Sequence, residues 1–108
     1  MSAEKRQHPR IGLSSAAVLV APADGGFLTR VEDVSAGGAR VTKPALWPDH
    51  EDSAERFKLF FIFDQDTVLA IRARMVRAGP DHLAFVFESG QDSTVDELLY
   101  ESRFLSQQ

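Results

Sequence analysis

The chain has 108 residues and is 44% hydrophobic and 26% charged, which suits one domain that buries its own core without a metal or a disulfide. It contains no cysteine, which excludes disulfide bonds and thiolate catalysis. Its net charge of −4 makes general binding to DNA or RNA unfavourable, because that affinity depends largely on neutralising phosphates. No apolar run approaches the ~20 residues of a membrane span and no signal peptide is recognisable, so we expect a cytoplasmic protein with no membrane partner.

The first predicted element is a flexible polar arm, residues 1–11, which contains the run Arg6-Gln7-His8-Pro9-Arg10. Residues 1–10 hold three basic side chains and one acidic side chain, a charge of +2 within a total of −4. Pro9 disfavours helical angles at His8, so we expect the arm to be extended, with its two arginines at most about 13–14 Å apart. This span is about the size of a dinucleotide, and a small basic patch on an acidic body suits a small anion.

Strand patterns dominate the middle of the chain and define a predicted barrel domain, residues 12–89. Gly-rich and Asp-rich turn signals separate them. The strand pattern at residues 67–77 alternates between apolar and basic side chains, which is typical of a half-buried strand. The apolar residues are Leu69, Ile71, Ala73 and Met75, and the basic ones are Arg72 and Arg74. The six expected strands cover residues 13–21, 27–34, 39–42, 57–63, 67–77 and 82–88. Six strands of this length predict a small antiparallel β-barrel, since closure removes exposed strand edges.

The last segment, residues 90–108, changes from strand to helix periodicity. Val95, Leu98, Leu99 and Leu105 fall on one helical face, which we expect to pack on the barrel. Thr94 and Glu97 fit a capping box at the start of this helix, and Asp92 or Ser93 could serve as the cap instead.

A second polar motif, Asp33-Val34-Ser35-Ala36-Gly37-Gly38, lies at the predicted turn between the second and third strands. It combines a carboxylate, a hydroxyl and two glycines at a tight bend. Taken alone, Asp33 and Ser35 are ordinary turn caps, and the arginines of the arm are ordinary solvated charges. Taken together, the two motifs can hold a compact ligand that carries phosphates and purine edges.

These two motifs, in this order and flanking one strand hairpin, resemble those of the PilZ domain family. The family pattern is RxxxR on an N-terminal arm, followed by D/N-x-S-x-x-G at the turn between the second and third strands. The matching residues here are Arg6, Arg10, Asp33, Ser35 and Gly38. The resemblance extends over roughly residues 4–105 and implies a mainly β protein, a six-stranded barrel with a C-terminal helix. It also implies binding of the bacterial second messenger cyclic di-GMP, with no enzymatic activity, no catalytic residue, no metal and no other cofactor.

The arginines suit this messenger chemically. A guanidinium pairs with phosphate oxygens as a fork, meets the O6 and N7 atoms of guanine, and stacks on a purine. Many members of the family have another arginine just before the first motif arginine, where this chain has Lys5. Lysine keeps the charge but loses the planar guanidinium. The number of bound messenger molecules therefore stays open between one and a stacked pair, and we favour the pair.

The second motif supplies different contacts. We expect Asp33 to accept hydrogen bonds from the N1–H and N2–H₂ groups of guanine, and Ser35 to bind a phosphate, a base or its own turn. Gly37 and Gly38 allow positive φ and a close approach of the ligand to the backbone. An arm that closes over the ligand would give a switch between a disordered and an ordered state.

The leading hypothesis is therefore a cyclic di-GMP receptor that reorders its arm and signals to an unidentified effector protein. The first alternative is a degenerate PilZ-type adaptor that binds a protein and no nucleotide. A barrel that binds single-stranded nucleic acid is a third reading, which the acidic body and the lack of a basic-aromatic stripe oppose.

Several other residues are left outside the predicted site. His82 is expected at the surface, and Trp47 either packs over the barrel or contacts a partner. The arginines of the later strands are expected to be solvated rather than part of the site; they are Arg40, Arg72, Arg74 and Arg77.

Overall fold

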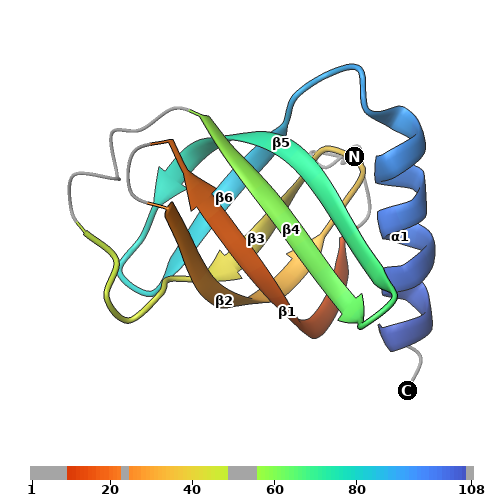
Figure 1. Ribbon diagram of the computed structural model, residues 1–108, viewed down its shortest axis with the longest axis horizontal. Coiled ribbons are helices and arrows are strands. Elements are labelled where there is room, and N and C mark those ends of the chain that lie inside the picture. The colour runs from red at the N-terminus through yellow and green to blue at the C-terminus, as the bar shows by residue number, and fades with distance from the viewer. Residues whose placement is uncertain (1–9, 23–24, 49–55, 107–108) are drawn as a thin grey trace, which may run out of the picture.

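The chain folds into a closed β-barrel with a helix at one end (Figure 1). The computed structural model describes residues 10–22, 25–48 and 56–106. Within them lie β1 (Ile11–Ala21), β2 (Gly25–Val34), β3 (Gly38–Thr42), β4 (Arg56–Asp64), β5 (Thr67–Ala78), β6 (His82–Phe87) and α1 (Asp92–Ser106). The predicted architecture of six strands and a terminal helix is confirmed. No helix in the described part of the chain has the length and apolar character needed to span a bilayer.

The strands follow the order β1-β2-β3-β6-β5-β4 around the barrel, and every neighbouring pair is antiparallel. The observed strand ends lie within two residues of the predicted ones. Gly25 and Gly26, expected in a turn, instead open β2 and pair with Ala21 and Val20. Gly25 has φ of +83°, which a glycine adopts at little cost, and the pairing of β1 with β2 extends two residues further than the sequence predicts.

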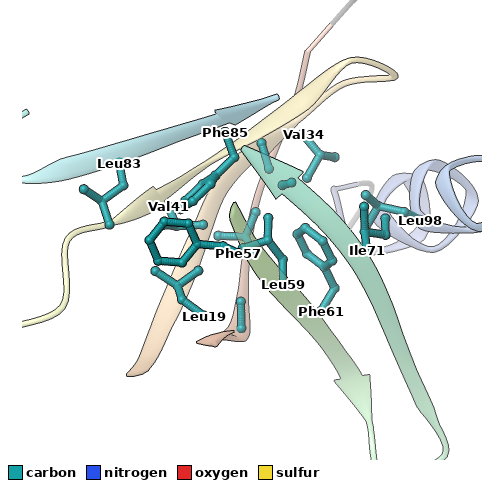
Figure 2. Close-up of a cluster of buried hydrophobic side chains, with 14 of the residues drawn as sticks. Leu19, Val34, Val41, Phe57, Leu59, Phe61, Ile71, Leu83, Phe85 and Leu98 are labelled. Carbon is teal, nitrogen blue, oxygen red and sulfur yellow. The ribbon is translucent and has the colours of Figure 1, made fainter. Parts of the chain in front are cut away.

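The barrel interior is filled by alternate side chains of all six strands (Figure 2). Leu19, Leu59, Phe61, Ile71 and Leu83 are each 0% exposed, as the period of two in their strands requires. Burial of these side chains is the main stabilising term of the fold, at roughly 1.5–3 kcal/mol each relative to exposure.

Trp47, in the segment after β3, packs onto this interior. Its ring centroid lies 5.0 Å from that of Phe27 and 5.9 Å from that of Phe57, and the residue is only 8% exposed. Of the two readings left open for Trp47, the structure supports packing over the barrel.

The helix α1 packs on β1 and β5, with Leu98 fully buried beside Ile71 (Figure 2). It begins at Asp92, where the Val95 N–H donates to the Gln91 carbonyl at 2.9 Å. The predicted cap at residues 92–94 is therefore wrong, and the reason is a long-range contact. The Gln91 side-chain amide donates to the Arg72 carbonyl at 2.9 Å and accepts from the Arg72 N–H at 2.8 Å. Gln91 thus continues the β5 ladder beyond β6 and fixes where the helix starts.

Candidate functional site

The turn between β2 and β3 is held by its own hydrogen bonds. The Ser35 N–H donates to the Gly38 carbonyl at 2.8 Å, and the Gly37 N–H donates to Ser35 Oγ at 3.3 Å. Ser35 is only 3% exposed. Of the roles expected for this hydroxyl, the structure shows the bond to its own turn.

Gly38 is required by packing rather than by its backbone angles. Among the described residues, the glycines with positive φ are Gly25 and Gly90, so Gly37 and Gly38 do not use the positive φ that glycine permits. A Cβ at Gly38 would lie 2.1 Å from the Phe85 carbonyl oxygen. The motif glycine therefore lets β6 lie close against the start of β3, which it pairs through Val86.

The carboxylate of Asp33 binds two arginines. Arg10 Nε donates to Asp33 Oδ1 at 2.6 Å, and Arg10 Nη2 lies 2.5 Å from the same oxygen. Arg40 Nη2 donates to Asp33 Oδ2 at 2.8 Å, and its Nε lies 3.3 Å from a carboxylate oxygen of Glu32. Arg10 Nη1 also reaches Ser35 Oγ at 3.4 Å. The last arginine of the first motif and the acid and hydroxyl of the second motif thus form one network, as their shared site predicts.

Arg40 joins this network because of the strand register. β3 pairs with β2 so that Arg40 stands directly opposite Asp33. Arg40 was predicted to be solvated and outside the site; its side chain is indeed 47% exposed, but it also binds Asp33. The missing information was the register shift between Val31 and Asp33, which no alternation of apolar residues reveals.

Three interruptions of the strand ladders surround the network. They fall between Gly12 and Ser15 in β1–β2, between Val31 and Asp33 in β2–β3, and between Met75 and Arg77 in β5–β6. Such bulges bend a strand and change the direction of its side chains, and they are frequent beside functional sites. Here they direct charged side chains of three separate strands toward one region.

That region is a cavity of about 890 Å³, which lies within the usual range of small-molecule sites. Its polar and charged lining comes from Arg10, Glu32, Asp33, Ser35, Arg40, Arg77 and His82, and its apolar part includes Val76, Phe85 and Val86. Three guanidiniums therefore face two carboxylates, which leaves the lining net positive within an acidic protein. An anionic ligand with flat apolar faces fits this combination.

The predicted site residues that the structure describes lie together. Arg10, Asp33, Ser35, Gly37 and Gly38 all line the cavity. Lys5 and Arg6 lie outside the described residues.

The cavity also contains residues that were predicted to lie outside the site. Arg77 lines it, contrary to the expectation, whereas Arg72 and Arg74 lie outside it. His82 is on its wall as well, with 22% of its side chain exposed and its Nδ1 3.2 Å from Asp81 Oδ1. The bulge between Met75 and Arg77 is what brings Arg77 into the cavity, and the sequence carries no clear signal for it.

Comparison with known proteins identifies the family to which this arrangement belongs. A model of the PilZ domain matches residues 4–102. The chain belongs to the PilZ domain family. No match to a curated protein was found for this PilZ domain.

Solved structures similar to this PilZ domain share its fold. The PilZ domain of YcgR from Escherichia coli, solved with c-di-GMP, has a TM-score of 0.77 and 19% identity, over 96% of this chain and 93% of that one. The PilZ domain of CeSA from a cellulose-synthesizing bacterium has a TM-score of 0.66 and 23% identity, over 85% and 95% of the two chains. The Bacillus subtilis inhibitor of motility MotI/DgrA has a TM-score of 0.73 and 16% identity, over 98% of this chain and 54% of that one.

Proposed function

We propose that this PilZ domain is a receptor for cyclic di-GMP that passes its signal to an effector protein. The observation that carries the proposal is the network of Arg10, Asp33, Arg40 and Ser35 on the wall of the cavity. It joins the two motifs of the family at a net positive cavity of suitable size. The proposal is also supported by the fold shared with a PilZ domain solved with c-di-GMP.

In this proposal the arginines bind the phosphates and guanines of the messenger. Arg10 is well placed for this role, because 31% of its side chain is exposed although it already contacts Asp33. A phosphate that approaches the network competes with Asp33 for the guanidiniums, and charge-assisted bonds of both kinds are strong. Arg6 would add a second guanidinium from the arm, and Lys5 a further charge.

The switch in this proposal acts through Arg10. This residue directly precedes β1, so it links the arm to the barrel. In this proposal the messenger draws Arg10 away from Asp33, and the surface altered where the arm joins β1 is what the effector recognises.

Titration calorimetry with cyclic di-GMP tests the proposal. We expect binding by the native chain, and Arg10→Ala to weaken it by about 1.5–3 kcal/mol, which is roughly 10- to 150-fold, as a charge-assisted contact is lost. The matched control is Arg56→Ala, which removes an arginine outside this cavity and should leave the affinity unchanged. Equal affinity of the native chain and Arg10→Ala would contradict the assignment. The same titration gives the number of messenger molecules bound per chain, which Lys5, in place of the arginine of many family members, leaves open between one and two.

A second candidate is an adaptor that binds a protein partner without nucleotide. It is favoured by one observation: both oxygens of Asp33 are already bound by arginines, so the acid of the second motif is satisfied without a ligand. No heat of binding from cyclic di-GMP, together with an unchanged cellular output for Arg10→Ala, would support this candidate over the receptor.

A further inference from the structure

The outer surface of β2, β1, β4 and β5 is unusually apolar for a strand face that points away from the core. Ala17, Leu19, Leu59 and Phe61 fill the interior, so the residues between them point outward. Two cross-strand pairs, Val18 with Leu28 and Val18 with Phe60, lie at the centre of this surface. We call it the apolar face and define it by Val18, Val20, Leu28, Phe60, Ile62 and Val68. Leu28 is 71% exposed and Val68 is 49% exposed.

The apolar face lies on the other side of the barrel from the cavity. It is built on β1 and β4, which cross the near side of the barrel in Figure 1, whereas β3 and β6 lie behind them. Four adjacent strands at a spacing of about 4.8 Å give it a width of about 14 Å. An α-helix with its side chains is about 10–12 Å in diameter, so one helix covers the face. Contiguous apolar patches of a few hundred Å² on soluble proteins are often interaction sites.

Charges of opposite sign lie at the two ends of the face. At one end Lys58 stands directly opposite Arg72, and in the next outward pair Arg56 stands opposite Arg74. Like charges placed opposite each other across two strands are destabilising, and of these four side chains Arg72 has an acidic neighbour in the same chain, with its Nε 3.7 Å from a carboxylate oxygen of Glu88. Asp64 and Asp66 lie at the other end, at and just after the end of β4, and Arg30 of β2 stands nearby on the same face, opposite Ala16, so this end is acidic by one charge. A partner with acidic side chains toward Lys58 and Arg72 and a basic side chain toward Asp64 and Asp66 would complement the two ends.

The outer side of α1 has this pattern. Tyr100 and Phe104 are 58% and 51% exposed, and their ring centroids lie 4.9 Å apart. Asp96 and Glu97 precede this aromatic pair by about one turn, and Arg103 lies beside its C-terminal ring. The first acid of the helix is Asp92, two turns before Tyr100. From Asp92 to Arg103 the helix is about 16 Å long, close to the roughly 20 Å of strand between Lys58 and Asp64, whereas Glu97 is only about 9 Å from Arg103.

We propose that the apolar face of one copy of this chain binds the outer side of α1 of a second copy. The pair Tyr100 and Phe104 packs on Val18 and Phe60, with the acidic start of α1 toward Lys58 and Arg72. A two-fold axis makes the contact reciprocal, so that each copy contributes both surfaces. The cavity stays open in such a dimer because it lies on the β3–β6 side. The proposal does not depend on ligand binding.

Sedimentation analysis over a range of protein concentrations provides the first test. The native chain should dimerise, and both Leu28→Glu and Phe104→Ser should be monomeric at concentrations where the native chain is dimeric. Both residues are more than half exposed, so the fold should survive, which a thermal melt checks. Leu46→Glu is the matched control, because Leu46 is 89% exposed but lies outside the apolar face, and it should dimerise like the native chain. A native chain that stays monomeric throughout, or a Leu28→Glu variant that dimerises normally, overturns the proposal.

Charge exchange and crosslinking test the orientation. Arg72→Glu alone and Glu97→Lys alone should each weaken the dimer several-fold, and the double variant should recover most of the loss. The chain has no cysteine, so Leu28→Cys and Phe104→Cys can be prepared as separate proteins and mixed. Oxidation should yield mainly the mixed pair. Failure of the double variant to recover, or equal crosslinking within each unmixed protein, excludes this arrangement. Neither experiment alters a cavity residue, so a negative result leaves the receptor proposal to its own titration.

Discussion

The two sides of the barrel are built according to different rules. On the β1–β4 side, the ladder from Ala16–Ile62 to Val20–Lys58 runs without a break, and the outward side chains are mostly apolar. The β4–β5 ladder on this side shifts register between Ile62 and Asp64, at its end beside the turn. On the cavity side, three of the ladders that supply its walls shift register beside the residues that line it. Regular pairing therefore supports a flat packing surface, whereas irregular pairing directs charges from separate strands to one place. The bulges, rather than the barrel as such, create the candidate binding site.

The largest effect is expected from a substitution in the hydrophobic core, which supports both sides of the barrel. Phe61→Ala should lower the free energy of unfolding by about 3–5 kcal/mol, because it opens a cavity in a fully buried part of the core. Chemical denaturation measures the change, and Phe61→Leu, which keeps most of the volume, should cost much less. If the free energy of unfolding of the alanine variant fell by less than about 1 kcal/mol, burial of Phe61 would not be the main support of the barrel.

The next variant separates packing from ligand chemistry on the cavity side. Gly38→Ala should destabilise the fold by about 1–3 kcal/mol, because its Cβ would overlap the Phe85 carbonyl oxygen at 2.1 Å. Gly12→Ala is the control at the same cavity, since the nearest neighbour of its Cβ is 4.0 Å away. Thermal melts of the two variants should differ clearly. Equal stability of the two variants would mean that the close packing of β6 does not require a glycine at position 38.

A third variant tests whether Asp33 only holds the two arginines or also contacts guanine. Asp33→Ala should lower stability by about 1–2 kcal/mol, because the carboxylate is only 11% exposed and holds two guanidiniums together. If Asp33 also reads guanine, the variant should lose more affinity for cyclic di-GMP than for inorganic pyrophosphate, as calorimetry with each would show. Equal losses for both ligands would reduce its role to holding Arg10 and Arg40.

The smallest effect is expected at α1. Ser102 is 0% exposed and its Oγ has no hydrogen-bond partner among the described residues. Ser102→Ala removes this unsatisfied group and improves helix propensity, so stability should stay the same or rise by up to about 1 kcal/mol. A clear loss in a denaturation experiment would reveal a bond made by this hydroxyl in solution.

Local patterns in the sequence were enough to predict the barrel. The period of two in residues 67–77 and the helical spacing of Val95 and Leu98 each reflect which side of an element is buried, and burial dominates the energy of the fold. The two motifs likewise indicated the region of the site, because Arg10, Asp33 and Ser35 do meet there.

What the sequence did not reveal depends on contacts between distant segments. Arg40 joins the site through the register of β3 on β2, and α1 starts where it does because Gln91 binds the backbone of Arg72. The continuous apolar run Ala16-Ala17-Val18-Leu19-Val20-Ala21 is a local signal that could have been used further. Such a run is typical of a strand covered on both faces, and here only one face is covered by the barrel's own core.

Two strands connect the opposite sides of the molecule. β2 carries Leu28 of the apolar face and Asp33 of the cavity, and β5 carries Val68 and Arg77 in the same two roles. Each strand is hydrogen-bonded to a neighbour along both edges, and in each a register shift lies between the residue of the apolar face and the residue of the cavity. The same two strands can therefore carry a regular surface at one end and an irregular, charged one at the other, because the bulge separates the two parts.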